Sequence, residues 1–132
     1  MSAFLKHGLL AMLGFMVLDG VWLGLLMTSF YRDQLGAIAR LSNGKLAPDW
    51  SAALVVYVLL GAGIAAFAVP RAAQASSAAA AGGLLGLVIY GVYDFTNYST
   101  LRDWPFALAV VDTAWGVAAT AICAAAVWMA TR

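Results

Sequence analysis

Residues 88–116 decide how this chain folds, and they read V-I-Y-G-V-Y-D-F-T-N-Y-S-T-L-R-D-W-P-F-A-L-A-V-V-D-T-A-W-G from Val88 to Gly116. The first part continues an apolar run and predicts the end of a long helix. A short loop follows, and Pro105 lies in the first turn expected for the next helix, where proline is tolerated. Both sides of the loop carry polar side chains within otherwise apolar helices: Tyr90, Tyr93, Asp94, Asn97, Asp112 and Trp115. This is an unusual place for two carboxyl groups.

The composition shows what surrounds this stretch. Apolar residues make up 64% of the 132 residues and charged residues 10%, whereas soluble domains have about 45–50% and about 25%. A chain of this length cannot bury so much apolar surface in its own core, so lipid must be its solvent. The formal net charge is only +1, and we expect no nucleic-acid partner. The single Cys123 excludes an internal disulfide and is expected to be a small buried side chain.

Four apolar segments are long enough to cross a bilayer, at about residues 4–30, 51–69, 76–98 and 105–129. They predict an all-α bundle of four transmembrane helices in two helical hairpins, with both termini on one side of the membrane. We therefore expect residues 1–132 to form a single integral membrane domain. A cleaved signal peptide is not expected, because Asp19 interrupts the first apolar run and no A-x-A site follows Gly24.

Local signals mark the second span. Ser42-Asn43-Gly44 is typical of a turn in the polar connection that precedes it. Asp49 is expected to cap the N-terminus of the second helix, with Trp50 as an anchor at the membrane interface. Pro70 is expected to end this helix.

Small residues at four-residue spacing occur in the first and third spans. They are Gly20-x-x-x-Gly24 and, in an alanine-rich helix, Gly82-x-x-x-Gly86. In lipid such spacing lets helix backbones approach closely. The spacing predicts helix contacts within the chain, and it leaves open a homodimer formed through these faces.

Three aspartates fall within the predicted spans: Asp19, Asp94 and Asp112. At about 1.5 Å per residue they lie roughly 7–17 Å from the face that bears the first and third loops, in one half of the bilayer or near its centre. A carboxylate at the centre of a spanning helix costs on the order of 2.5–3.5 kcal/mol, so such groups face the bundle interior and need partners. No Lys, Arg or His lies at that depth, and at least one of the three is expected to hold a proton at neutral pH.

Hydrogen-bond donors share helix faces with these carboxyl groups. An Asp-x-x-Trp sequence occurs in both the first and the fourth span, and a polar stripe with helical spacing occurs in the third. Indole N–H and phenol O–H groups can donate to a carboxylate. We therefore take the three aspartates as candidate catalytic residues. Six further residues are candidate ligand-binding residues: Trp22, Tyr57, Tyr90, Tyr93, Asn97 and Trp115.

Three short motifs carry a resemblance to a known family. They are Y-D-F-T-N at 93–97, L-R-D-W-P at 101–105 and D-T-A-W-G at 112–116. With these motifs the chain resembles a family of small bacterial membrane proteins that is defined as a domain of unknown function, and the resemblance extends over essentially the whole chain. It implies a four-helix protein of the cell inner membrane and adds no activity or catalytic residue.

The favoured interpretation is a site inside the membrane that binds or acts on a small or lipid-like molecule. Asp94 and Asp112 would donate and accept a proton, while Asn97 and the tyrosines orient the ligand. One alternative is a proton-coupled small transporter, against which the opposite half of the bilayer offers no polar path. The other is a structural or partner subunit of a membrane complex, in which the acidic cluster only fixes helix register.

Cofactor chemistry has little support in the sequence. Three aspartates can hold a hard cation, but no motif spacing supports a metal site, and no paired Cys or His residues are present to hold a haem. We therefore expect no metal and no cofactor. The expected partners are the lipid bilayer and a small-molecule or lipid ligand. Whether the chain is an enzyme, and which way it faces in the membrane, are left open by the residues themselves.

Overall fold

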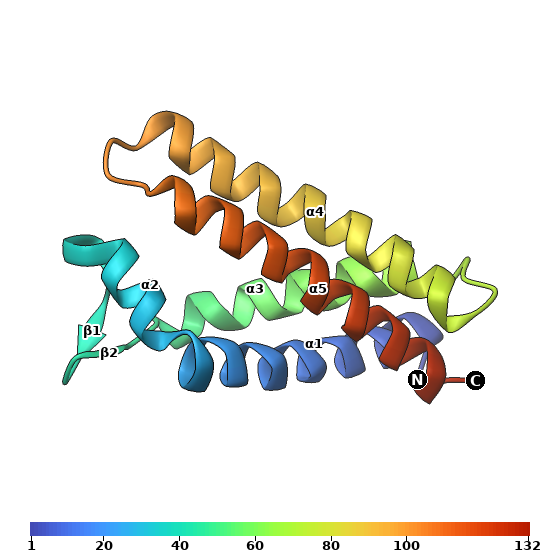
Figure 1. The fold of residues 1–132 in the computed structure, drawn as a ribbon. Coiled ribbons are helices and arrows are strands. Elements are labelled where there is room, and N and C mark those ends of the chain that lie inside the picture. The colour runs from blue at the N-terminus through green and yellow to red at the C-terminus, as the bar shows by residue number, and fades with distance from the viewer.

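Figure 1 shows the fold in a computed structural model that describes residues 1–132. Four long apolar helical segments run antiparallel in sequence order, and both termini lie at the same end of the bundle. The segments are Ala3–Leu26, Trp50–Ala68, Ala75–Thr100 and Phe106–Ala130. Only 25 of the 132 residues are buried, so most apolar side chains face outward, as they do in lipid. The predicted all-α bundle of two helical hairpins is confirmed.

The first span differs from the single helix expected over 4–30. Helix α1 covers Ala3–Val21, a π-helical segment covers Trp22–Leu26, and a separate helix α2 covers Thr28–Leu35. The break is at Met27, whose φ of −121° and ψ of 13° are not helical. Its N–H donates to the Trp22 carbonyl over 2.7 Å, which closes a wider, five-residue turn. Helix α2 then leaves the line of α1 and rises toward the other hairpin (Figure 1).

The connection to the second span contains a small β-hairpin. A short 3₁₀ turn at Gly36–Ile38 precedes antiparallel strands β1 (Leu41–Ser42) and β2 (Lys45–Leu46). Asn43 and Gly44 between them have φ of 51° and 74°. Two positive φ angles give the turn whose twist matches that of paired strands. The turn predicted at this Ser-Asn-Gly sequence is confirmed, while the two strands it joins were not predicted.

The second span begins as expected. Helix α3 covers Trp50–Gly63, and the Asp49 carboxylate caps it by accepting from the amides of Ser51 (3.0 Å) and Ala52 (3.2 Å). Hydrogen bonds from the Ser51 hydroxyl and these amides hold the pKa of Asp49 below its ordinary value. A π-helical segment, Ile64–Ala68, follows α3 and ends just before Pro70. Proline has no N–H for the next helical hydrogen bond, so the span stops there.

Helices α4 (Ala75–Thr100) and α5 (Phe106–Ala130) form a closely packed antiparallel hairpin. A Cβ atom on Gly82 would lie only 2.5 Å from the Thr120 carbonyl oxygen, and one on Gly86 would meet the Gly116 carbonyl even more closely. The Gly82-x-x-x-Gly86 face is therefore occupied by α5 and is not free to hold a second copy of the chain. Gly20 and Gly24 of the first span have nothing within 4 Å.

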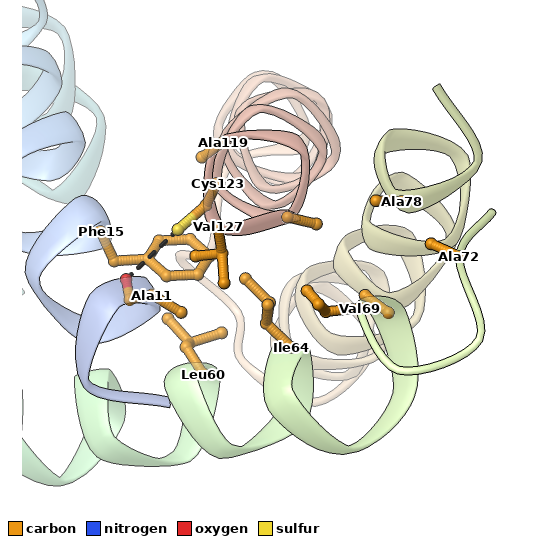
Figure 2. Packing of buried hydrophobic residues seen from close by; sticks show 12 residues of the cluster. Ala11, Phe15, Leu60, Ile64, Val69, Ala72, Ala78, Ala119, Cys123 and Val127 are labelled. Carbon is orange, nitrogen blue, oxygen red and sulfur yellow. Dashed lines mark hydrogen bonds between the residues drawn. The ribbon is translucent and has the colours of Figure 1, made fainter. Parts of the chain in front are cut away.

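The apolar core lies in the half of the bundle nearer the termini, and Figure 2 shows how its side chains pack. Phe15 of α1 packs there against the end of α3 and against small residues of α5. The Cys123 thiol donates to the Ala11 carbonyl over 3.2 Å and is not disulfide-bonded, so the predicted small buried cysteine is confirmed. Close packing of this kind holds membrane helices together, because lipid removes the hydrophobic advantage of burial.

Candidate functional site

The buried polar side chains include one aspartate from each of three helices. Asp19 of α1 is 8% exposed, Asp94 of α4 is 0% exposed, and Asp112 of α5 is half-buried. Tyr90 of α4 lies among them. The structure thus brings the three sequence-predicted aspartates into one cluster, in the half of the bundle nearer the two outer loops.

The two Asp-x-x-Trp segments exchange hydrogen bonds across the bundle. The Trp115 indole N–H of α5 donates to Asp19 Oδ1 of α1 over 2.8 Å. In the other direction, the Trp22 N–H donates to the Tyr31 hydroxyl over 3.0 Å, and that hydroxyl donates to Asp112 Oδ1 over 2.6 Å. Each carboxyl group is therefore held by a donor chain that begins on the opposite helix.

The two indoles also stack on each other. The ring centroids of Trp22 and Trp115 are 4.4 Å apart and the planes are inclined by 2°. A stacked aromatic pair contributes about 0.5–1.5 kcal/mol beyond its area burial. The stack fixes the distance between the first span and α5, and thereby the positions of the two carboxyl groups that the indoles serve.

Tyr31 is a site residue that sequence reasoning missed. It lies just beyond the first span predicted at residues 4–30, and α2 turns back there so that the Tyr31 side chain is buried. Burial and the neighbouring Asp112 raise the pKa of the Tyr31 phenol above its ordinary value. The phenol therefore stays protonated and keeps its role as the hydrogen-bond donor to Asp112. No proline or turn signal in the sequence marks the break at Met27 that positions it.

Asp94 is the most enclosed member of the cluster. Its carboxyl group lies against that of Asp112, and neither of its oxygens accepts a hydrogen bond from an N–H or O–H group of the chain. The Thr113 hydroxyl and the Trp104 indole lie beside it, yet both of these donors are also buried and unpaired. The Asp94 carboxyl group and these two donors thus approach one another without forming well-aligned hydrogen bonds.

Trp104 and Thr113 were not among the predicted site residues. Trp104 directly precedes the predicted fourth span at 105–129, and Thr113 follows the candidate residue Asp112. Thr113 is nevertheless buried, with 8% exposed, and adjoins Asp94 across the α4–α5 contact. Thr96, in the motif at 93–97, instead lies exposed on α4. The close α4–α5 approach selects between these threonines, and helical spacing alone does not reveal it.

The remaining predicted ligand-binding residues fall into an inner and an outer group. In the inner group, Tyr57 of α3 lies beside Asp19, and the Tyr90 ring packs directly on the backbone of Gly116. In the outer group, Tyr93 is 55% exposed and its ring meets the Trp104 ring edge-on at 5.8 Å. Asn97 lies next to the Tyr93 hydroxyl. The outer pair borders lipid and does not contact Asp19.

The cluster is suited to proton exchange more than to metal binding. No group of three or more His, Cys, Asp or Glu side chains converges in the chain as metal ligands do. Two carboxyl groups that lie side by side repel each other when both are ionised, which favours a proton on one of them. The arrangement can therefore give a proton to, or take one from, a polar group placed beside Asp94.

Comparison with known proteins places the chain in a family. The family described as "Predicted membrane protein (DUF2177)" matches residues 4–129, in agreement with the resemblance seen in the sequence motifs. Comparison with curated proteins found no match, and comparison with solved structures found none. The four apolar spans and this match make it a multi-pass membrane protein. The chain therefore belongs to the family of predicted membrane proteins DUF2177.

Proposed function

We propose that the Asp94–Asp112 pair binds a small polar or lipid-like molecule inside the membrane and exchanges a proton with it. The observation that carries this proposal is the lack of well-aligned hydrogen bonds at Asp94, among its two carboxyl oxygens, the Thr113 hydroxyl and the Trp104 N–H. Buried polar groups in proteins are almost always hydrogen-bonded, so four unpaired ones around one spot need an explanation. A bound molecule with a hydroxyl, amine or phosphate group would join them.

The neighbouring hydrogen bonds argue against a cluster that serves only to hold the helices. Around Asp19 and Asp112 the donors and acceptors pair directly, with distances of 2.6–3.0 Å. A purely structural network gains most when every member is satisfied. Asp94 departs from that pattern, although donors stand next to it. We infer that Asp19, Asp112 and the two indoles form the frame, and that Asp94 faces the ligand.

Proton transfer follows from the pairing of the two carboxyl groups. A proton on Asp94 passes to a basic atom of the ligand, whose positive charge then offsets the second carboxylate, and it returns when the ligand leaves. The Tyr31 hydroxyl donates to Asp112, and such a bond stabilises a carboxylate. We therefore assign the proton exchange to Asp94, and the contact with Tyr31 to Asp112.

Access is expected from one leaflet, between α4 and the loop that precedes α5. Tyr93 and Asn97 line this approach, and Tyr93 touches both the lipid and the Trp104 ring. The opposite half of the bundle is filled by the apolar cluster around Phe15 and Ile64. That half offers no polar path, which favours binding or catalysis over a proton-coupled transporter. We also propose that the chain lies in a cell inner membrane. Its spans are helices, whereas outer-membrane proteins of the common type span with barrels of strands.

A lipid-soluble carbodiimide tests the proposal. Dicyclohexylcarbodiimide takes the proton of a carboxylic acid and then bonds to its oxygen, so it labels protonated carboxyl groups that can be reached from lipid. We expect labelling of the folded protein at neutral pH, and loss of that labelling in Asp94→Asn/Asp112→Asn. Leu87→Asn is the matched control. Leu87 lies on α4 with 49% of its surface exposed, so the substitution adds an amide group outside the cluster.

Two results would contradict the proposal. One is absence of labelling in the wild-type protein, and the other is equal labelling in the double asparagine variant. Asparagine keeps the shape and hydrogen bonding of aspartate without its exchangeable proton. In any cellular assay that a deletion strain fails, the folded double variant should therefore fail as well. Full activity of that variant would leave only a structural role for Asp94 and Asp112.

A further inference from the structure

The end of the bundle that carries the termini has a charge pattern of its own. Its charged or ionisable side chains lie near the ends of the spans Ala3–Leu26, Trp50–Ala68 and Phe106–Ala130, and all are basic: Lys6, His7, Arg71 and Arg132. The aspartates outside the central cluster lie toward the opposite end, as does the one ion pair of the chain, between Arg32 and Asp33 at 3.1 Å. The basic groups at the terminal end therefore have no acidic partner within the chain.

A cavity at this end brings two of these basic residues together. Its volume is about 210 Å³, and its lining residues are His7, Val69, Pro70, Thr131 and Arg132. Pockets that hold drug-sized ligands measure roughly 300–1,000 Å³, so this cavity suits a smaller group. The lining contains two basic side chains and no aspartate or glutamate, so the cavity suits an anion.

The guanidinium group of Arg132 is held in place by Ala72 and Trp128 of the same chain. Its Nη2 donates to the Ala72 carbonyl over 3.0 Å, and its central carbon lies 4.5 Å from the centroid of the Trp128 ring. The Trp128 indole N–H donates to the same carbonyl over 3.0 Å. A guanidinium has five N–H donors, so most remain for a ligand. A fixed, planar donor group of this kind matches the oxygens of phosphate.

The depth of the cavity indicates where its ligand comes from. His7 lies near the start of the span Ala3–Leu26, Val69 and Pro70 directly follow Trp50–Ala68, and the other two lining residues directly follow Phe106–Ala130. All five therefore lie where three apolar spans end, at the level of lipid headgroups. Phosphate groups are the anions of that layer.

We propose that this cavity binds the phosphate group of an anionic phospholipid, with Arg132 as the main phosphate ligand and His7 as the second. The site is separate from the aspartate cluster, since the apolar core lies between them. Soluble phosphate compounds share the same chemistry, but the headgroup-level position of the cavity favours the lipid. Binding would anchor the terminal ends of three spans to one leaflet.

Native mass spectrometry of the full-length protein in detergent tests this site, with phosphatidylglycerol and phosphatidylcholine titrated separately. We expect phosphatidylglycerol to bind more tightly than phosphatidylcholine. Arg132→Gln should weaken phosphatidylglycerol binding by roughly tenfold or more, because charge-assisted hydrogen bonds are lost. His7→Gln should weaken it less. The matched control is Arg102→Gln, an exposed basic residue at the opposite end, which should bind as the wild type does.

Three results would overturn the proposal. The first is the same affinity for phosphatidylglycerol in Arg132→Gln and Arg102→Gln. The second is equal affinity of the wild type for the two lipids. The third is displacement of bound lipid by inorganic phosphate, which would identify a soluble phosphate as the ligand. If Arg132→Gln does not stay folded, His7→Gln and Arg132→Lys replace it, and affinity unchanged in both contradicts the site equally.

Discussion

Asp19-x-x-Trp22 and Asp112-x-x-Trp115 share one sequence pattern but sit in different backbones. The second lies within the unbroken helix α5, whereas the first spans the change from α1 to the π-helical segment that ends at Leu26. The Trp115 indole donates directly to the Asp19 carboxyl group, over 2.8 Å. The Trp22 indole instead donates to the Tyr31 hydroxyl, which in turn donates to Asp112. The break in the first span thus places Tyr31, a titratable residue, between Trp22 and Asp112.

The residue after each tryptophan also differs. Gly116 follows Trp115, and the Tyr90 ring lies where a Cβ on this glycine would be. Leu23 follows Trp22 and is only half-buried. The α5 segment is therefore fixed by close packing against α4, and the α1 segment by hydrogen bonds to α2 and α5. We expect substitutions in the two segments to differ accordingly.

The largest expected effect is that of Gly116→Ala. The new methyl group would overlap the Tyr90 ring, and such overpacking costs about 3 kcal/mol, near the upper end of its usual range. Leu23→Ala is the counterpart in the first span and should cost clearly less. Unfolding in mixed detergent and dodecyl sulfate micelles measures both. Equal loss of stability in the two variants would remove the proposed difference in packing.

Trp115→Phe should have the next largest effect. It leaves the buried Asp19 carboxyl without its indole donor, which costs about 1–3 kcal/mol. Trp22→Phe removes only the donor to the Tyr31 hydroxyl, which still donates to Asp112, so about 1 kcal/mol is expected. The same unfolding assay compares the two. A greater loss in Trp22→Phe would show that the arm through Tyr31 carries more of the stability.

Tyr31→Phe tests the relay by its pH dependence. Because burial and Asp112 raise the pKa of Tyr31, the unfolded chain ionises this phenol near pH 10, about its ordinary value, while the folded chain does not. The stability that Tyr31 contributes, about 1 kcal/mol, is therefore fully present below about pH 10 and is lost as the pH rises further. The free energy of unfolding should fall more steeply with pH above pH 10 in the wild type than in Tyr31→Phe. Parallel curves would contradict a buried, protonated Tyr31.

The smallest effect is expected for Gly20→Ala, beside Asp19. A Cβ there meets nothing within 4 Å, so the stability should stay within about 0.5 kcal/mol of the wild type. Gly86→Ala, on α4, is the contrasting glycine and should destabilise strongly. A self-association measurement on Gly20→Ala also tests the remaining glycine face. Loss of a dimer in that variant would show that the open face of the first span holds a second copy.

Much of the fold could be predicted because lipid imposes simple rules. The length of the apolar runs predicts the spans, and the shared depth of Asp19, Asp94 and Asp112 places them in one half of the bundle. The rest depends on geometry that residue spacing does not contain. No proline marks the break at Met27, so Tyr31 could not be placed. Spacing gives the face of Asp94 on its own helix, but the rotation of α5 against α4 decides that Thr113 adjoins it.

A structure determined with native lipid retained tests the central claim most directly. If Asp94 and Asp112 hold a ligand, non-protein density larger than a water molecule should lie within hydrogen-bonding distance of Asp94, contacting Thr113 or Trp104. The frame formed by Trp22, Trp115 and Tyr31 should be unchanged around it. Direct hydrogen bonds from Thr113 and Trp104 to Asp94, or a single ordered water joining them, would contradict the claim and leave a cluster that only holds the helices together.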